Sequence, residues 1–401
     1  MTSPPMTSPS ITTGRAGWFS LISATTTAVV VGFASTILLI MEAARTVGAT
    51  PAQQASWAAA LCIAMAVTSF ILSWRYKMPI ITAWSTPGAA LIATSASGVT
   101  YPDALGAFVV AGALMVVAGL IKPLEKAIEK IPAPIAAAML AGVLLRYTLG
   151  VPAAALAEPV FVIPLIAVFF SLRMMWPLYA VPVIVVLGVV MALLSGGMAE
   201  NCCHFGFTAL EWTTPTFHLQ TAISIGVPLF LVTMASQNLP GFAVLRASGY
   251  QPPVQPCLLV TGIGSTLMAP FGSHAINMAA ITAAIVTGPD CHPDKDKRWL
   301  VAWPYLILYG LIGLMAASFV EILGALPTPL ITAIAGLALF SPLMGGISAM
   351  TKEPRDLESA LVTFLVTASG LTIAGVGSAF WGLVAGLVLF AGRHIMEMRA
   401  G

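Results

Sequence analysis

The polar side chains of this sequence that are best placed to bind a small molecule lie in three short stretches within long uncharged runs. The stretches are residues 78–92, 236–241 and 268–281. Their hydroxyl, amide, imidazole and backbone N–H groups can donate hydrogen bonds to a carboxylate or a similar small anion. The candidate binding residues are Ser85, Thr86, Gly88, Gln237, Asn238, Ser273, His274 and Asn277.

The first and last of these stretches share a pattern, because each begins with proline and polar residues and then becomes continuously apolar. We expect residues 79–85 and 270–276 to be extended half-spans that meet head to head near the middle of a membrane, each followed by a helix. Pro87 suits the first turn of one helix, and Asn277 suits the N-cap of the other. The helix N-termini would then direct N–H groups at one point, which favours an anion. The alternative is that proline and glycine only kink two ordinary helices.

The middle stretch ends an expected helix over residues 219–237. The amides of Gln237 and Asn238 could donate to a carboxylate or form hydrogen bonds between helices. An ordinary helix end, capped before Pro240, is the alternative interpretation.

His274 is the ionisable group of greatest interest, since no charged residue lies between Gln251 and Pro289. Ionisable side chains within a membrane are functional candidates by default. We therefore consider His274 a candidate for proton coupling, with a neutral, hydrogen-bonded structural histidine as the alternative. Aromatic residues flank the polar stretches and could form walls for an aromatic solute, although packing is their default role. They are Trp84, Phe242 and Phe271.

Composition places the chain in a membrane. Of its 401 residues 58% are apolar and 8% are charged, and the mean hydropathy is +0.95. Soluble domains carry about 25% charged residues. The net charge of +2 provides no field for nucleic acid. The sequence lacks HExxH and GxSxG motifs and a mid-membrane carboxylate pair, and no lysine follows a glycine, which excludes a Walker A motif. An enzyme is therefore not expected.

Charged residues divide the chain into fourteen apolar runs of roughly the ~20 residues that cross a bilayer. With both termini in the cytoplasm, the outer side holds only Arg45 and Arg146 of the seventeen lysines and arginines. Cytoplasmic loops are expected to hold most such residues. This distribution favours an even number of spans. Residues 1–17 are rich in serine, threonine and proline, and predict a disordered tail.

Weak internal repeats recur at an offset of about 190–195 residues. Because each half then contains seven spans, the two halves have opposite orientation, an arrangement common among transporters. The matched segments are 131–135 with 326–330, 141–142 with 335–336, and 89–93 with 279–283.

Cys202-Cys203-His204 is the only cluster that suggests metal chemistry. Adjacent cysteines rarely build a tetrahedral site, so two small residues in a loop are the better interpretation. We expect neither a metal nor another cofactor.

Three segments, 72–90, 236–245 and 269–283, resemble the benzoate:proton symporter family, and the likeness extends over essentially the whole chain from residue 18. That family is similar in turn to nucleobase and sulfate permeases. The resemblance implies an all-α integral membrane protein with fourteen transmembrane spans as 7+7 inverted repeats. Spans 3 and 10 would be part extended and part helical, and a core domain would slide against a gate domain.

The same resemblance implies the domain limits. The expected segments are a tail at 1–17, core spans 1–4 at 18–121, gate spans 5–7 at 122–197, an outer loop at 198–218, core spans 8–11 at 219–322 and gate spans 12–14 at 323–401. Nucleobase permeases carry carboxylates on spans eight and ten, where this chain has Ser236, Gln237 and Asn277. The difference fits an anionic substrate and leaves the proton pathway open.

The expected function is a secondary active transporter that imports an aromatic carboxylate such as benzoate in symport with protons, by elevator-like movement of core against gate. A nucleobase or inorganic-anion permease of the same fold is the alternative. The expected partners are the carboxylate, the proton and the lipid bilayer, without nucleic acid, and a homodimer is one expected assembly. The resemblance implies the bacterial inner membrane, with both termini cytoplasmic.

Overall fold

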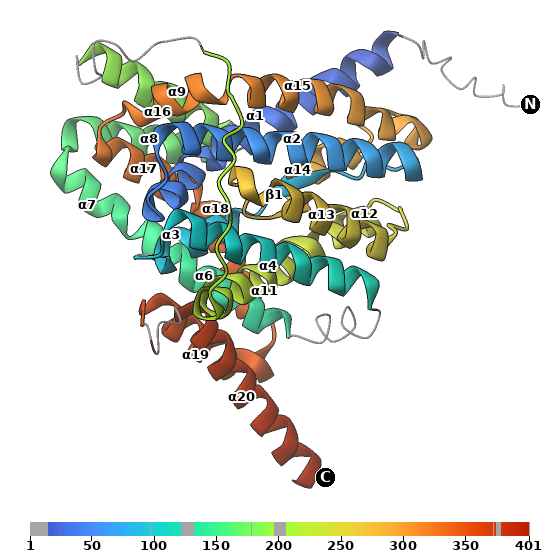
Figure 1. Ribbon diagram of the computed structural model, residues 1–401, viewed down its shortest axis with the longest axis vertical. Helices are drawn as coiled ribbons and strands as arrows, with labels where there is room; N and C mark the ends of the chain where they lie inside the picture. Colours follow the sequence, from blue (N-terminus) through green and yellow to red (C-terminus); the bar gives the residue numbers. More distant parts are fainter. Residues whose placement is uncertain are drawn as a thin grey trace, which may run out of the picture.

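The computed structural model describes residues 15–96, 98–121, 132–177, 179–195, 206–371, 373 and 378–400. Most of these residues are helical (Figure 1). The longer helices are α1 (Arg15–Thr46), α2 (Pro51–Tyr76), α3 (Thr86–Ser95), α4 (Tyr101–Leu120), α6 (Ala133–Thr148), α7 (Gly150–Ala157), α8 (Pro159–Met175), α9 (Ala180–Leu194), α11 (Val227–Thr233), α12 (Leu239–Ala247), α13 (Val254–Met268), α14 (Ile281–Thr287), α15 (Ala302–Leu314), α16 (Ala316–Gly324), α17 (Thr328–Ala338), α18 (Phe340–Met350), α19 (Leu357–Ala368) and α20 (Ser378–Ala400).

Eight continuous helices in the described part of the chain are long and apolar enough to cross a membrane. The run Lys295–Leu314 and helix α16 make a ninth candidate, bent by 58°. Helices α8 and α9 are also apolar but shorter, at 17 and 15 residues. The predicted class, a mostly helical membrane protein, is confirmed. The count of fourteen spans stays a prediction.

Both broken stretches contain a short strand followed by a helix. Strand β1 (Thr82–Trp84) precedes α3, and strand β2 (Ile276–Met278) precedes α14. The strands pair antiparallel, with Ala83 opposite Asn277. The ends of the two predicted stretches therefore meet, with Trp84 opposite Ile276, and strand pairing continues side by side from there to Met278. Figure 1 shows β1 near the centre of the molecule.

The second extended stretch begins later than the predicted residue 270. Residues Ala269–Phe271 form a 3₁₀ turn, which accommodates Pro270 in its first positions, and the chain becomes extended only after Gly272. Gly272 has a φ of 108°, a conformation that favours glycine. The extended chain thus begins about one turn later than the prolines indicated.

Side chains complete the hydrogen bonding of the two strands. Backbone polar groups need partners at membrane depth, and a two-stranded ribbon leaves part of its backbone unpaired. Here neighbouring helices provide hydroxyl and amide groups. The bonds are Ile80 N–H to Ser73 Oγ (3.0 Å), Thr82 N–H to Ser69 Oγ (2.9 Å), Ile276 N–H to Ser265 Oγ (2.8 Å), Met278 N–H to Asn238 Oδ1 (2.8 Å) and Tyr305 Oη–H to the Thr82 carbonyl (2.7 Å).

Leu219–Ala247 is one continuous helix that contains two π-helical turns, at Ala222–Gly226 and Met234–Asn238. Gln237 and Asn238 therefore lie inside a helix, and the predicted helix end at residue 237 is wrong. Pro240 fits because the wider π turn precedes it, at the start of α12. Such turns occur often at functional sites.

Helices α4 and α13 pack closely against each other, and α13 lies against β2. A Cβ atom on Gly112 of α4 would lie 2.9 Å from the Thr266 nitrogen, and one on Gly262 of α13 would lie 2.8 Å from the Val116 nitrogen. Small residues allow helix backbones to approach in this way within a membrane. Strand β2 consequently packs on a helix, α13, that is itself held tightly by α4.

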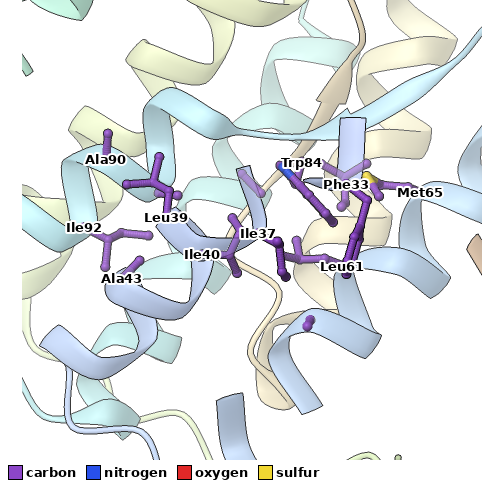
Figure 2. Close-up of a cluster of buried hydrophobic side chains, with 14 of the residues drawn as sticks. Phe33, Ile37, Leu39, Ile40, Ala43, Leu61, Met65, Trp84, Ala90 and Ile92 are labelled. Carbon is purple, nitrogen blue, oxygen red and sulfur yellow. The ribbon is translucent and has the colours of Figure 1, made fainter. Parts of the chain in front are cut away.

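Helix α1 covers another side of the ribbon. In Figure 2, Phe33 and Ile37 lie beside Trp84, while Leu39 and Ala43 lie beside α3. All five side chains are buried. This apolar packing fixes β1 and α3 against the first helix.

Residues 206–218 form an extended segment that crosses the helices (Figure 1). Its backbone N–H groups donate hydrogen bonds to several segments that the family resemblance would place in the core domain. The bonds run from Thr208 N–H to the Leu314 carbonyl (2.8 Å), from Glu211 N–H to Ser56 Oγ (2.9 Å), from Thr213 N–H to the Pro270 carbonyl (2.9 Å) and from Thr216 N–H to the Pro102 carbonyl (3.0 Å).

Some predictions fall outside the described residues. These are the tail over residues 1–14, the Cys202-Cys203-His204 cluster and the domain boundaries after residues 121 and 197. The last three residues of the predicted tail belong to α1, which begins at Arg15.

Candidate binding site

Ser85 lies at the centre of the candidate site, where β1 meets α3. It is the N-cap of α3, and its Oγ accepts the Gly88 N–H (3.1 Å) and the Thr233 hydroxyl (2.9 Å). Pro87 occupies the first turn of the helix, as predicted. A Cβ atom on Gly88 would lie 2.5 Å from Leu229 Cδ1. The first turn of α3 is therefore packed tightly against α11.

His274 joins the second broken segment to the first. Its Nδ1 lies 3.1 Å from the Trp57 indole nitrogen, and its Nε2 lies 2.9 Å from the Ser85 carbonyl oxygen. An indole N–H can only donate, so Nδ1 must accept, and the ring proton is on Nε2, which donates to Ser85. The imidazole is fully buried and neutral in this arrangement.

Asn277 and Asn238 also support backbone groups. The Asn277 amide is oriented so that its oxygen accepts the Ser85 N–H (2.9 Å) and its nitrogen donates to the Met278 carbonyl (2.9 Å). The Asn238 oxygen accepts the Met278 N–H, while its nitrogen faces the Met234 sulfur at 3.2 Å. Asn277 lies in β2, and α14 begins four residues later without a side-chain cap. The predicted N-cap role of Asn277 is therefore wrong.

Four other polar side chains keep hydrogen-bonding capacity. Within the described part of the chain, the hydroxyl oxygens of Ser236 and Ser273 are buried without a hydrogen-bond partner. Thr86 and Gln237 are half-buried, and their side chains form no hydrogen bond with described residues. A buried polar group without a partner costs about 1–3 kcal/mol. A bound ligand that supplied hydrogen-bonding atoms would recover that free energy.

Charge in the site comes from the backbone. The eight predicted site residues include no acid, lysine or arginine. The N-terminus of the ten-residue helix α3 contributes partial positive charge beside Ser85 and Thr86. This arrangement suits an anion whose charge is neutralised by hydrogen bonds.

Trp84 provides an aromatic surface next to Ser85. Its indole N–H donates to Thr36 Oγ1 (2.7 Å), and its ring lies 6.0 Å from the Phe33 ring, centroid to centroid. Phe271 instead packs on Trp212 of the 206–218 segment, at 5.4 Å. Of Trp84 and Phe271, only Trp84 therefore lies next to the Ser85 turn, because it directly precedes Ser85 in the sequence.

The structure connects most of the predicted residues and adds others. Ser85, Gly88, His274 and Asn277 share direct hydrogen bonds, and Asn238 joins them through Met278. Sequence reasoning did not select Trp57, Thr233 or Ser265. Ser69 and Ser73, which bind the backbone of the first broken segment, lie one helical turn apart in the apolar half of α2, and that spacing could have indicated them.

Comparison with known proteins adds independent findings. Residues 18–391 match the family model BenE, described as benzoate membrane transport protein. The chain is 42% identical to inner membrane protein YdcO of Escherichia coli, over 93% of this chain and 95% of that protein. It is 31% identical to a benzoate membrane transport protein of Acinetobacter baylyi, over 90% and 92% of the two chains.

Solved structures show a similar fold at low sequence identity. The transmembrane domain of the cyanobacterial bicarbonate transporter BicA aligns with a TM-score of 0.63 and 14% identity, over 93% of this chain and 98% of that one. Murine Slc26a9, an anion transporter in the inward-facing state, aligns with a TM-score of 0.63 and 13% identity, over 98% of this chain and 73% of that one.

Proposed function

This chain belongs to the BenE family of benzoate membrane transport proteins, and we propose that it imports benzoate or a close aromatic carboxylate in symport with protons. Membrane transport follows from the family and from the transporter fold. The choice of substrate, the coupling to protons and the transport mechanism are the proposal.

One observation carries the choice of substrate. The first turn of α3 begins beside paired strands in an uncharged, buried setting, where Ser236 and Ser273 keep unpartnered hydroxyls. A carboxylate can accept several hydrogen bonds at once, and such charge-assisted bonds are stronger than neutral ones. An acidic side chain there would repel it.

We assign two roles to the predicted residues. Thr86, Gln237 and Ser273, together with Ser236, would bind the carboxylate directly, because their polar groups are not used within the protein. Ser85, Asn238, His274 and Asn277 would position the backbone, because their hydrogen bonds are already made. Gly88 would keep the first turn of α3 close to α11, and Trp84 would provide an apolar surface for the aromatic ring.

Elevator-like movement of a core against a gate belongs to the same proposal. If α8, α9, α19 and the two strand–helix segments also cross the membrane, they and the nine span candidates would make fourteen crossing segments. The repeat places Gly142 and Gly336 in equivalent positions, and both lie against the backbone of another residue. A Cβ atom built on Gly142 would lie 2.8 Å from the Phe364 carbonyl oxygen, and one built on Gly336 would lie 2.9 Å from the Tyr147 carbonyl oxygen. Both features support 7+7 inverted repeats. An even number of crossings would place the two termini on the same side of the membrane, which we propose is the cytoplasm.

The route of the proton is the least constrained part. His274 stays a candidate, yet its two ring nitrogens are occupied by Trp57 and Ser85, which favours the structural alternative. The proton would then cross on the substrate as benzoic acid, or on Glu42 or Glu321.

A substrate panel tests the proposal against the nucleobase or inorganic-anion alternative. Proteoliposomes loaded with unlabelled benzoate should exchange it for external labelled benzoate. Excess benzoate or a ring-substituted benzoate should block this counterflow, and uracil, bicarbonate and sulfate should not. Exchange that uracil or bicarbonate blocks more strongly than benzoate would contradict the proposed substrate.

A further inference from the structure

Helices α2 and α15 present a continuous apolar surface, which we call the α2–α15 outer face. Its residues recur every three or four positions, the spacing of one helix face. Phe70 on α2 packs edge-on against Trp303 on α15, with ring centroids 4.7 Å apart, so the two halves of the face are joined. The exposed members are Val67 (43%), Ile71 (44%), Trp74 (54%), Trp303 (45%), Ile307 (57%) and Leu311 (53%).

Lys77 lies at one end of this face in an uncommon backbone conformation. With a φ of 54°, it is the one described residue other than glycine with a positive φ. It ends α2 as the C-cap. Its Nζ atom lies 3.8 Å from the centre of the Trp299 ring and 5.6 Å from that of Trp74, both within cation–π distance. The strained turn thus holds a cation between two indoles.

The positive charge at this end is not neutralised by protein. Among the described residues, no carboxylate lies within ion-pair distance of Arg75 or Lys77. Nearby Lys297 pairs with Asp294 (3.3 Å), and Lys295 donates to the Gly249 carbonyl (2.6 Å). Two cations are consequently available to an external anion.

We propose that the α2–α15 outer face binds an anionic phospholipid, with its acyl chains along the apolar residues and its phosphate beside Arg75 and Lys77. Tryptophan and lysine at the end of an apolar helix mark the level of lipid head groups, and basic side chains there attract anionic lipids. A second copy fits this face less well. In a dimer with its two-fold axis along the membrane normal, Arg75 and Lys77 of one copy would lie close to the same two cations of the other copy, and the like charges would repel.

The bound lipid would lie against the helix that supports the candidate binding site. Ser73, one turn before Lys77, accepts the Ile80 N–H and donates to the Ile80 carbonyl (2.9 Å). Ile80 leads directly into β1. The proposed phospholipid therefore lies on the exposed face of the helix whose buried face holds the first broken segment.

Native mass spectrometry of the purified full chain tests the site by titration with phosphatidylglycerol or phosphatidylcholine of identical acyl chains. Lys77→Asn removes the charge and keeps a residue that tolerates positive φ. It should weaken phosphatidylglycerol binding about fivefold, and adding Arg75→Gln should weaken it further. Lys77→Arg should restore binding. Lys352→Gln, which removes an exposed charge elsewhere, is the matched control and should bind like the parent.

Several outcomes would overturn the assignment. Equal binding of the two lipids by the parent, or an equal loss in Lys352→Gln, would show that no specific head-group site exists. Full competition by soluble glycerol phosphate would indicate a site for a free anion. High-yield disulfide cross-linking of Ile71→Cys between two chains in membranes would assign the face to a second copy.

Discussion

The two strand–helix segments have similar shapes but different chemistry. In the first, α3 begins two residues after β1, and the residue between them, Ser85, caps the helix. In the second, α14 begins three residues after β2 and has no side-chain cap. The polar residues of the second segment, His274 and Asn277, bond to Ser85 of the first. The second segment therefore supports the first, and we infer that the substrate's carboxylate lies at the N-terminus of α3.

The largest effect is expected at Gly88. Gly88→Val would force atoms into Leu229 and the Ser85 hydroxyl, which lies 2.8 Å from a built Cβ. Such overpacking costs about 1–3 kcal/mol and would displace the cap. We expect lower thermal stability in detergent and loss of benzoate counterflow.

Gly345 provides the matched control, because a Cβ there meets nothing within 4 Å. Gly345→Ala should transport like the parent. If Gly88→Val also transports normally, the first turn of α3 is not part of the site.

Asn277→Leu should break the connection between the two segments. It removes the acceptor of the Ser85 N–H, which then keeps only the Ala275 carbonyl at 3.1 Å. We expect a loss of about 1–3 kcal/mol in unfolding free energy together with slower counterflow. An unchanged melting temperature with weaker benzoate binding would instead make Asn277 a direct contact.

Gln237→Leu should have the opposite effect to Asn277→Leu, with weaker benzoate binding and unchanged stability. The side chain of Gln237 forms no hydrogen bond with described residues, so its replacement should leave the melting temperature unchanged. The loss of one charge-assisted hydrogen bond, about 1.5–3 kcal/mol, should weaken benzoate binding roughly tenfold or more. Calorimetric titration measures that change, and parent-like affinity would exclude Gln237 from the site.

The smallest effect is expected for His274→Gln. Glutamine can donate to the Ser85 carbonyl and accept from Trp57, as the neutral imidazole does. Accumulation of benzoate driven by a pH gradient should therefore persist, whereas His274→Leu should impair binding and stability. If His274→Gln retains counterflow but no longer accumulates benzoate, His274 carries the proton.

The broken segments could be predicted from the sequence, but which of their residues support the backbone and which could bind the substrate could not. Proline and polar residues at Pro79, Pro87 and Pro270 are local signals, so the interruptions and the first turn of α3 were predictable. The role of Asn277 depends on Ser85, about 190 residues away, and that pairing is set by tertiary packing. The same reason explains why Trp57 and Thr233 were not selected.

Uptake of labelled benzoate into proteoliposomes with an imposed inward proton gradient tests the central claim most directly. Entry of the anion against a negative interior costs about 2.3 kcal/mol per 100 mV, and one co-transported proton would cancel that cost. We predict accumulation above the external concentration that collapses when a protonophore removes the gradient, beyond the uptake of protein-free liposomes. Uptake equal to that of protein-free liposomes would contradict proton-coupled transport of benzoate by this protein. Uptake that is the same with and without the proton gradient would contradict it as well.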